Sequence, residues 1–107
     1  MNIAIIGSGV GGLSSAIRLV KKGHTVSVFE RNKTYGGKLG SLKLGRFSFD
    51  TGPSLLTMPH LIDELFTLHD ENPRDYFNYT KKDIHCKYVW DDGTTFTAFS
   101  VKNKYVE

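Results

Sequence analysis

The first thirty residues change their pattern of hydrophobic and polar positions twice. Residues 3–6 form an unbroken apolar run ended by Gly7, which is typical of a strand buried on both faces in a parallel sheet. Residues 10–22 repeat apolar side chains three and four positions apart, which predicts an amphipathic helix. Residues 26–29 are again apolar at three of four positions and favour a second strand. Strand, helix and strand within about 30 residues predict one βαβ unit.

The chain after Glu30 predicts two hairpins and one more helix. Residues 41–44 and 46–49 alternate in polarity around Gly45, residues 60–69 form an apolar stripe that begins near Pro59, and residues 84–90 and 94–99 flank an Asp-Asp-Gly turn. The predicted fold class is therefore α/β: a Rossmann-like βαβ unit followed by a β-hairpin, a helix and a second β-hairpin.

Composition narrows the class of protein. The chain has 107 residues and 12.0 kDa, with 39% hydrophobic and 23% charged residues, which is typical of a globular chain with a modest core. Its one cysteine, Cys86, excludes an internal disulfide and a cysteine-rich zinc module. The sequence holds no apolar run of about 18–20 residues, no basic leader and no nucleic-acid-binding signature. We expect a cytoplasmic protein with no resident metal and no nucleic-acid partner.

Glycine and positive charge are concentrated in the first half. Ten of the 11 glycines lie in residues 1–52, and residues 1–49 hold eight Lys and Arg against one acidic residue, Glu30. Residues 50–107 hold six basic and ten acidic residues, so the net charge of +3 arises in the first half. This distribution suits a segment that brings bare backbone close to an anion.

The strongest motif is the G-x-G-x-x-G sequence of residues 7–12. It follows a predicted strand and opens a predicted helix, and the acidic Glu30 ends the second strand 23 residues after Gly7. In this motif Gly7 permits the tight turn, Gly9 lets a pyrophosphate approach the backbone, and Gly12 lets helix and strand come close. Glu30 would accept hydrogen bonds from the adenosine ribose, and its charge disfavours the 2′-phosphate of NADP.

A second glycine pair and a cation follow the acid, in Gly36-Gly37-Lys38. Together with the first motif, these residues resemble the amino-terminal signature of the FAD-dependent amine-oxidase-like flavoproteins, which include amine oxidases, protoporphyrinogen oxidase and carotenoid desaturases. Residues 46–54, R-F-S-F-D-T-G-P-S, are similar to the G-F-x-F-D-x-G-P-[ST] stretch of the phytoene desaturase branch, with Gly45 one residue early.

This resemblance implies a non-covalent FAD and the dehydrogenation of a long, lipophilic isoprenoid or carotenoid such as phytoene. The implied cofactor contacts are Gly7, Ser8, Gly9, Val10, Gly11 and Gly12 for the pyrophosphate, Glu30, Arg31, Gly37 and Lys38 for adenosine and phosphates, and Gly52, Pro53 and Ser54 near the flavin. The catalytic side chains stay unknown, because the flavin would carry the chemistry of a hydrocarbon substrate. The resemblance also implies peripheral contact with the inner face of the membrane.

The resemblance further implies that residues 1–107 are the amino-terminal part of an FAD-binding domain, with a dinucleotide-binding core in residues 1–40. The substrate domain and the second half of the flavin site would come from a missing carboxy-terminal portion. We therefore expect this chain to be inactive by itself and the full-length protein to be an oxidoreductase. Two alternatives stay open: another amine-oxidase-like flavoprotein acting on amines or protoporphyrinogen, and a non-catalytic nucleotide-binding remnant.

Two other residues have more than one interpretation, and one further pair is excluded as a metal site. Lys38 is either a phosphate contact or a surface charge. Asp50 is either a general base or a structural residue of the turn before Gly52, and the turn is favoured. His85 and Cys86 are neighbours in a predicted strand, so they point to opposite faces and do not form a chelating pair.

Overall fold

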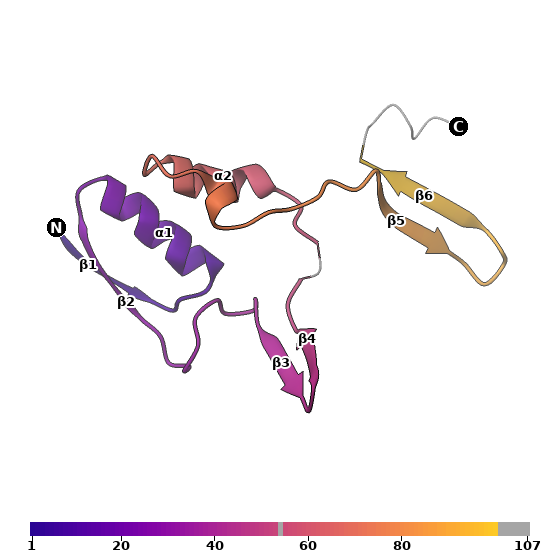
Figure 1. Cartoon of the computed structure of the whole chain (residues 1–107), viewed down its shortest axis with the longest axis horizontal. Coiled ribbons are helices and arrows are strands. Elements are labelled where there is room, and N and C mark those ends of the chain that lie inside the picture. Colours follow the sequence, from indigo (N-terminus) through magenta and orange to yellow (C-terminus); the bar gives the residue numbers. More distant parts are fainter. Residues whose placement is uncertain (54, 101–107) are drawn as a thin grey trace. The chain divides into compact units, whose positions relative to one another are not determined.

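The computed structural model describes residues 1–53 and 55–100 and divides the chain into two units, Met1–Tyr76 and Phe77–Glu107 (Figure 1). The elements are β1 (Asn2–Ile6), α1 (Val10–Lys21), β2 (Thr25–Phe29), β3 (Ser41–Leu44), β4 (Phe47–Asp50), α2 (Pro59–Thr67), the short 3₁₀ helix η1 (Pro73–Asp75), β5 (Ile84–Val89) and β6 (Thr95–Phe99). This order confirms the predicted fold class, with η1 as the one element that the sequence pattern did not predict.

β1, α1 and β2 form the predicted βαβ unit. β1 and β2 pair in parallel, from Asn2 opposite Thr25 to Ile6 opposite Phe29, and α1 connects them and packs against both strands. The helix ends at Lys21, one residue before the predicted end. Gly23 then adopts a φ of 83° and donates its N–H to the carbonyl of Val20 at 2.9 Å. A glycine in this left-handed conformation is a common way to end a helix.

The prediction that residues 3–6 are buried on both faces is wrong. Ile3 and Ile5 are half-buried, whereas Ala4 is exposed and Ile6 is 83% exposed. Successive side chains of a strand point to opposite faces, and the Cγ2 atom of Ile5 lies 3.5 Å from the position a Cβ would take on Gly12 of α1. α1 therefore covers the face that holds Ile3 and Ile5, and the face of Ala4 and Ile6 stays open.

The open sheet face is part of a general feature of the described residues. None of their large hydrophobic side chains is fully buried, and Ser8 and Pro73 are the buried residues. The described part of the chain thus has no closed hydrophobic core. Neither described helix is both long and apolar enough to cross a bilayer.

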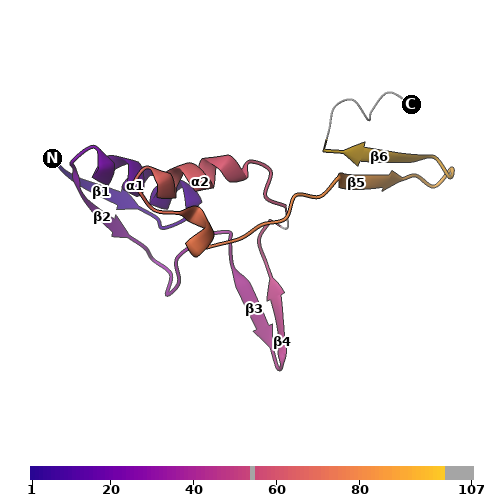
Figure 2. The same cartoon turned by 45° about the horizontal axis from the view of Figure 1, so that its top comes forward.

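α2 packs beside α1 within the first unit, and the views in Figures 1 and 2 agree on this arrangement. The guanidinium of Arg18 donates to both carboxylate oxygens of Glu64, each at 3.1 Å. This pair holds the pKa of Glu64 below its usual value, mainly through the hydrogen bond. A ring nitrogen of His69 also lies 3.1 Å from the carbonyl of Ile17. Polar contacts therefore join α1 to α2 and to His69 just after it. Residues of both helices also line an apolar groove of about 250 Å³.

Both predicted hairpins are present. β3 and β4 pair with Ser41 opposite Asp50, and the turn between them uses Gly45 at a φ of 61°. In the second unit β5 and β6 pair with an irregularity between Ile84 and Cys86, and the Asp-Asp-Gly turn places Gly93 at a φ of 85°. The carboxylate of Asp92 accepts the N–H of Thr94 at 2.9 Å, which closes this turn.

The start of α1 lies extremely close to the end of β1. A Cβ atom on Gly12 would run into the carbonyl oxygen of Gly7, whereas a Cβ atom on Gly11, the preceding residue of the same helix, would meet nothing within 4 Å. Gly12 is thus the position at which the βαβ unit requires a residue without a side chain, which agrees with the role that the motif gives it.

We expect opposite effects from alanine at these adjacent glycines. Gly12→Ala should destabilise the chain by about 1–3 kcal/mol, because the helix must shift away from the strand. Gly11→Ala should stabilise it by roughly 0.5–1 kcal/mol, because alanine has the higher helix propensity and the space is open. Thermal unfolding followed by far-UV circular dichroism measures both. Equal stability of the two variants would contradict the close approach.

Candidate functional site

The first glycine turn, which is the G-x-G-x-x-G segment of residues 7–12, leaves the start of α1 without a side-chain cap. Gly7 takes a φ of 99° and donates its N–H to the carbonyl of Phe29 at 2.7 Å, so the turn is fixed to the end of β2. Gly9 is the N-cap residue, no side chain bonds to the cap, and the first helical turn contains no acidic residue. The first N–H groups of α1 and the positive end of its dipole therefore favour an anion at this point.

The second glycine turn, Gly36-Gly37-Lys38, contacts the first one through backbone atoms. The N–H of Gly36 donates to the carbonyl of Ser8 at 2.8 Å, and Gly9 and Gly36 form an isolated parallel bridge. A Cβ atom on Gly37 would lie 3.0 Å from the Cα of Gly9. The structure therefore brings together the two glycine motifs that the sequence places 24 or more residues apart.

The third predicted segment, residues 46–54, contacts the second glycine turn at Gly52. A Cβ atom on Gly52 would run into the carbonyl oxygen of Lys38 and would lie 3.1 Å from the Cα of Leu39. Pro53, the next residue, lines an open cavity of about 390 Å³. The other lining residues are Gly9, Val10, Gly36, Gly37, Lys38 and Leu39. All three segments that the family resemblance singled out therefore contribute to one cavity.

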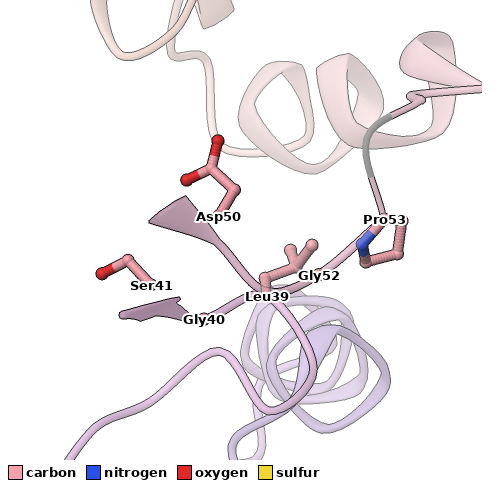
Figure 3. Close-up of a pocket in the computed structure, with 6 residues that line it drawn as sticks. All are labelled: Leu39, Gly40, Ser41, Asp50, Gly52 and Pro53. Carbon is pink, nitrogen blue, oxygen red and sulfur yellow. The ribbon is translucent and has the colours of Figure 1, made fainter. Parts of the chain in front are cut away.

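A neighbouring pocket of about 370 Å³ lies at the base of the first hairpin. Figure 3 shows Ser41 and Asp50 at the adjoining ends of β3 and β4, opposite Leu39 and Pro53. Because Ser41 and Asp50 are directly paired in the hairpin register, their oxygen atoms provide the polar side of this pocket. Neither interpretation of Asp50, as a base or as a turn residue, is tested by this geometry.

Glu30 is held by residues at both of its carboxylate oxygens. Oε2 accepts the backbone N–H of Ser8 at 2.8 Å and its hydroxyl at 2.9 Å, and Oε1 accepts the backbone N–H and the side-chain amide of Asn32, both at 2.8 Å. These bonds lower the pKa of Glu30 from 4.5 to about 2, with the backbone N–H of Asn32 as the largest cause and that of Ser8 next. The group is therefore a carboxylate throughout the physiological pH range.

The remaining predicted residues are more peripheral. Arg31 and Gly11 are exposed, Lys38 is exposed where it lines the cavity, and Ser54 lies outside the described residues. Asn32 was missed by the sequence reasoning, although its position two residues after an acid is a recognisable signal for a local side-chain hydrogen bond to backbone or carboxylate. Leu39, which lines both pockets, carried no sequence signal.

Within residues 1–53 and 55–100, no three His, Cys, Asp or Glu side chains are grouped as metal ligands would be. Cys86 is exposed, and its sulfur lies 3.8 Å from the carbonyl of Lys87. This geometry gives the His85–Cys86 pair no evident chemical role.

Comparisons with known proteins show the family of this chain. Residues 5–71 match the family model described as NAD(P)-binding Rossmann-like domain. A 1-hydroxycarotenoid 3,4-desaturase of a Flavobacterium species is 57% identical over 94 residues, which are 88% of this chain and 19% of that protein. A 4,4'-diapolycopene oxygenase of a Methylomonas species is 42% identical over 92 residues, which are 86% of this chain and 18% of that protein.

One solved structure supports the fold alone. A crystal structure of a Pyrococcus furiosus protein matches with a TM-score of 0.60 at 23% sequence identity, over 90% of this chain and 24% of that one. Relative to the desaturase and the oxygenase, this chain spans about a fifth of the length of the curated proteins that it matches.

The hydrogen bonds to Glu30 predict its titration. Because its pKa in the folded chain is about 2 and its ordinary value is 4.5, Glu30 contributes stability that is complete above about pH 4.5 and is lost as the pH falls towards 2. Carboxyl-carbon NMR should show a Glu30 midpoint near pH 2 in the folded chain and near 4.5 in urea. A folded-state midpoint at the ordinary value would contradict the four hydrogen bonds.

Proposed function

This chain belongs to the NAD(P)-binding Rossmann-like domain family, in the group that contains the carotenoid desaturases and oxygenases, and we propose that it forms the nucleotide-binding part of an FAD-dependent carotenoid desaturase. The observation that carries the proposal is the convergence of three sequence segments on one cavity of about 390 Å³. A simple dinucleotide site needs the first of these segments. The resemblance assigns the second segment to the adenosine and phosphates of the cofactor and the third to the region of its flavin.

The local chemistry fits the diphosphate of FAD. The two glycine turns approach each other so closely that a Cβ on Gly37 would crowd the Cα of Gly9, so both turns offer bare backbone. The uncapped start of α1 supplies N–H donors, and Lys38 adds a positive charge at the cavity. The backbone of Gly7 to Gly12 would hold the pyrophosphate, and the carboxylate of Glu30 would accept the ribose hydroxyls.

The flavin end would lie towards Gly52 and Pro53. A hydrocarbon substrate offers no group that an acid or base can hold, so FAD, when bound, would supply the redox chemistry. The protein's part is to bind and orient both molecules. In a protein of the relatives' length, we propose that a carboxy-terminal portion completes the flavin site and holds the substrate.

The substrate that we propose is an isoprenoid or carotenoid such as phytoene. The support is the 57% identity to a protein named as a hydroxycarotenoid desaturase, which exceeds the 42% identity to one named as a diapolycopene oxygenase. An oxygenase of the same group is the second candidate. Because such substrates partition into lipid, we propose that the protein works in the cytoplasm at the membrane surface.

Nucleotide selection tests the role of Glu30. AMP should bind at least about tenfold more tightly than adenosine 2′,5′-bisphosphate, which differs from it by the 2′-phosphate alone, because the carboxylate repels a phosphate on the 2′ oxygen. Titrations followed by NMR shifts of the Gly7–Gly12 amides measure both affinities even when they are weak. Glu30→Gln should weaken AMP binding and narrow the difference. Equal affinities in the unmodified chain would argue against the ribose contact.

The reaction itself is tested in the full-length protein with phytoene in lipid vesicles. Desaturation lengthens the conjugated polyene, so we expect absorbance at longer wavelengths that depends on added FAD. Glu30→Gln should lose activity at limiting FAD and regain part of it when FAD is in excess, while Asn78→Ala, on an exposed residue of the second unit, should behave like the unmodified protein. FAD-loaded protein that leaves phytoene unchanged and oxidises an amine or a porphyrinogen would reject the proposal.

A further inference from the structure

The carboxylate of Glu30 is saturated by donors of the chain itself. A carboxylate offers about four lone-pair directions, and Glu30 already accepts four hydrogen bonds, two at each oxygen. A ribose hydroxyl that donates to this group must therefore replace one of the four donors. Which donor gives way decides how the site works.

The four donors differ in how firmly they are held. Ser8 is 5% exposed, and its carbonyl accepts the N–H of Gly36, so the second glycine turn fixes its backbone. Its N–H and its hydroxyl both reach Oε2 from this buried position. The Oε2 side of the carboxylate is therefore enclosed by the fold.

The other oxygen is bound from the solvent side. Asn32 is exposed, and its side-chain amide is attached through rotatable bonds, whereas its backbone N–H is part of the chain just after β2. The amide of Asn32 can rotate into water at little cost, because solvent satisfies its hydrogen bonds. Among the four donors, the side-chain amide of Asn32 is the one that is exposed and attached through rotatable bonds.

We propose that the two neighbours of Glu30 have opposite roles: Ser8 is a positioning residue that fixes the carboxylate, and the Asn32 side-chain amide occupies the place of a ligand hydroxyl and is exchanged for it on binding. The ligand class is a ribose with free 2′ and 3′ hydroxyls, such as the adenosine half of a dinucleotide. This inference rests on the proposed function, since it concerns how the same acid receives the nucleotide.

The exchange model predicts changes of opposite sign. Asn32→Ala keeps the backbone N–H bond but removes the competing amide, so ADP should bind roughly threefold to tenfold more tightly. Ser8→Ala removes a buried hydrogen bond that orients the carboxylate, so ADP should bind more weakly by a similar factor. NMR titration with ADP, read at the Gly7–Gly12 amides, measures both effects.

Two matched controls isolate the hydroxyl contact. The gain in Asn32→Ala should vanish when 2′,3′-dideoxyadenosine 5′-diphosphate replaces ADP, because that ligand has nothing to exchange. Ser14→Ala removes a hydroxyl that donates to the carbonyl of Val10 and does not touch Glu30, so it should leave ADP affinity unchanged.

A ligand-free readout checks that the variants act through Glu30. The Ser8 hydroxyl depresses the pKa of Glu30 more than the Asn32 side chain does, so the NMR midpoint should rise more in Ser8→Ala than in Asn32→Ala. This ordering also shows that both variants are folded around the acid. Should Ser8→Ala fail to fold, the exposed Asn32→Ala and the dideoxy ligand still decide the exchange.

The outcomes separate this inference from the proposed function. Unchanged or weaker ADP binding in Asn32→Ala overturns the exchange, and a gain that persists with the dideoxy ligand does the same. If Glu30→Gln loses ADP binding in either case, the nucleotide site itself still stands. If ADP shifts no glycine amide in the unmodified full-length protein, both the site and the exchange are rejected.

Discussion

Direct backbone contact between two glycine turns is the constraint on which the candidate site depends. The N–H of Gly36 donates to the carbonyl of Ser8, and a Cβ atom on Gly37 would crowd the Cα of Gly9. This contact fixes the backbone of Ser8, and Ser8 in turn fixes the carboxylate of Glu30. It also closes one side of the cavity that Lys38 and Pro53 line. The candidate site is thus assembled from short turns, and the residues that the structure describes form no closed hydrophobic core around it.

The positive charges of residues 1–49 do not act together as one binding surface. Most of these basic residues are exposed, and Arg18 is committed to Glu64 on the second helix. The features that favour an anion are instead the uncapped start of α1 and the single cation Lys38 beside the cavity. The carboxylate of Glu30 is bonded to Ser8 of the first glycine turn, and we propose that it recognises a neutral diol rather than a phosphate. The excess of positive charge in residues 1–49 is therefore a poor guide to where a ligand binds.

Local sequence patterns predicted most of the fold. The change from an apolar run to a helical period predicted the positions of β1 and α1. Both hairpins turn where the sequence predicted, at Gly45 and Gly93, which adopt positive φ angles. The predicted two-sided burial of β1 was wrong because burial depends on which elements pack on a strand, and residues 3–6 alone carry no such information. The Rossmann spacing predicted that Gly7–Gly12 and Glu30 would be neighbours. It did not predict Asn32 or Leu39, because their importance arises from contacts between loops, which have no period in the sequence.

The parallel ladder of β1 and β2 limits how this half of the chain can vary. Ile6 pairs with Phe29, and the N–H of Gly7 donates to the carbonyl of Phe29. The register of β1 and β2 therefore fixes the position of Glu30, which follows Phe29 directly. Removing or adding one residue in the turn after α1 would move every side chain of β2 to the opposite face or break the ladder. Glu30 would then point away from Ser8. Homologous chains should therefore differ here by substitution and keep the length between Gly7 and Glu30.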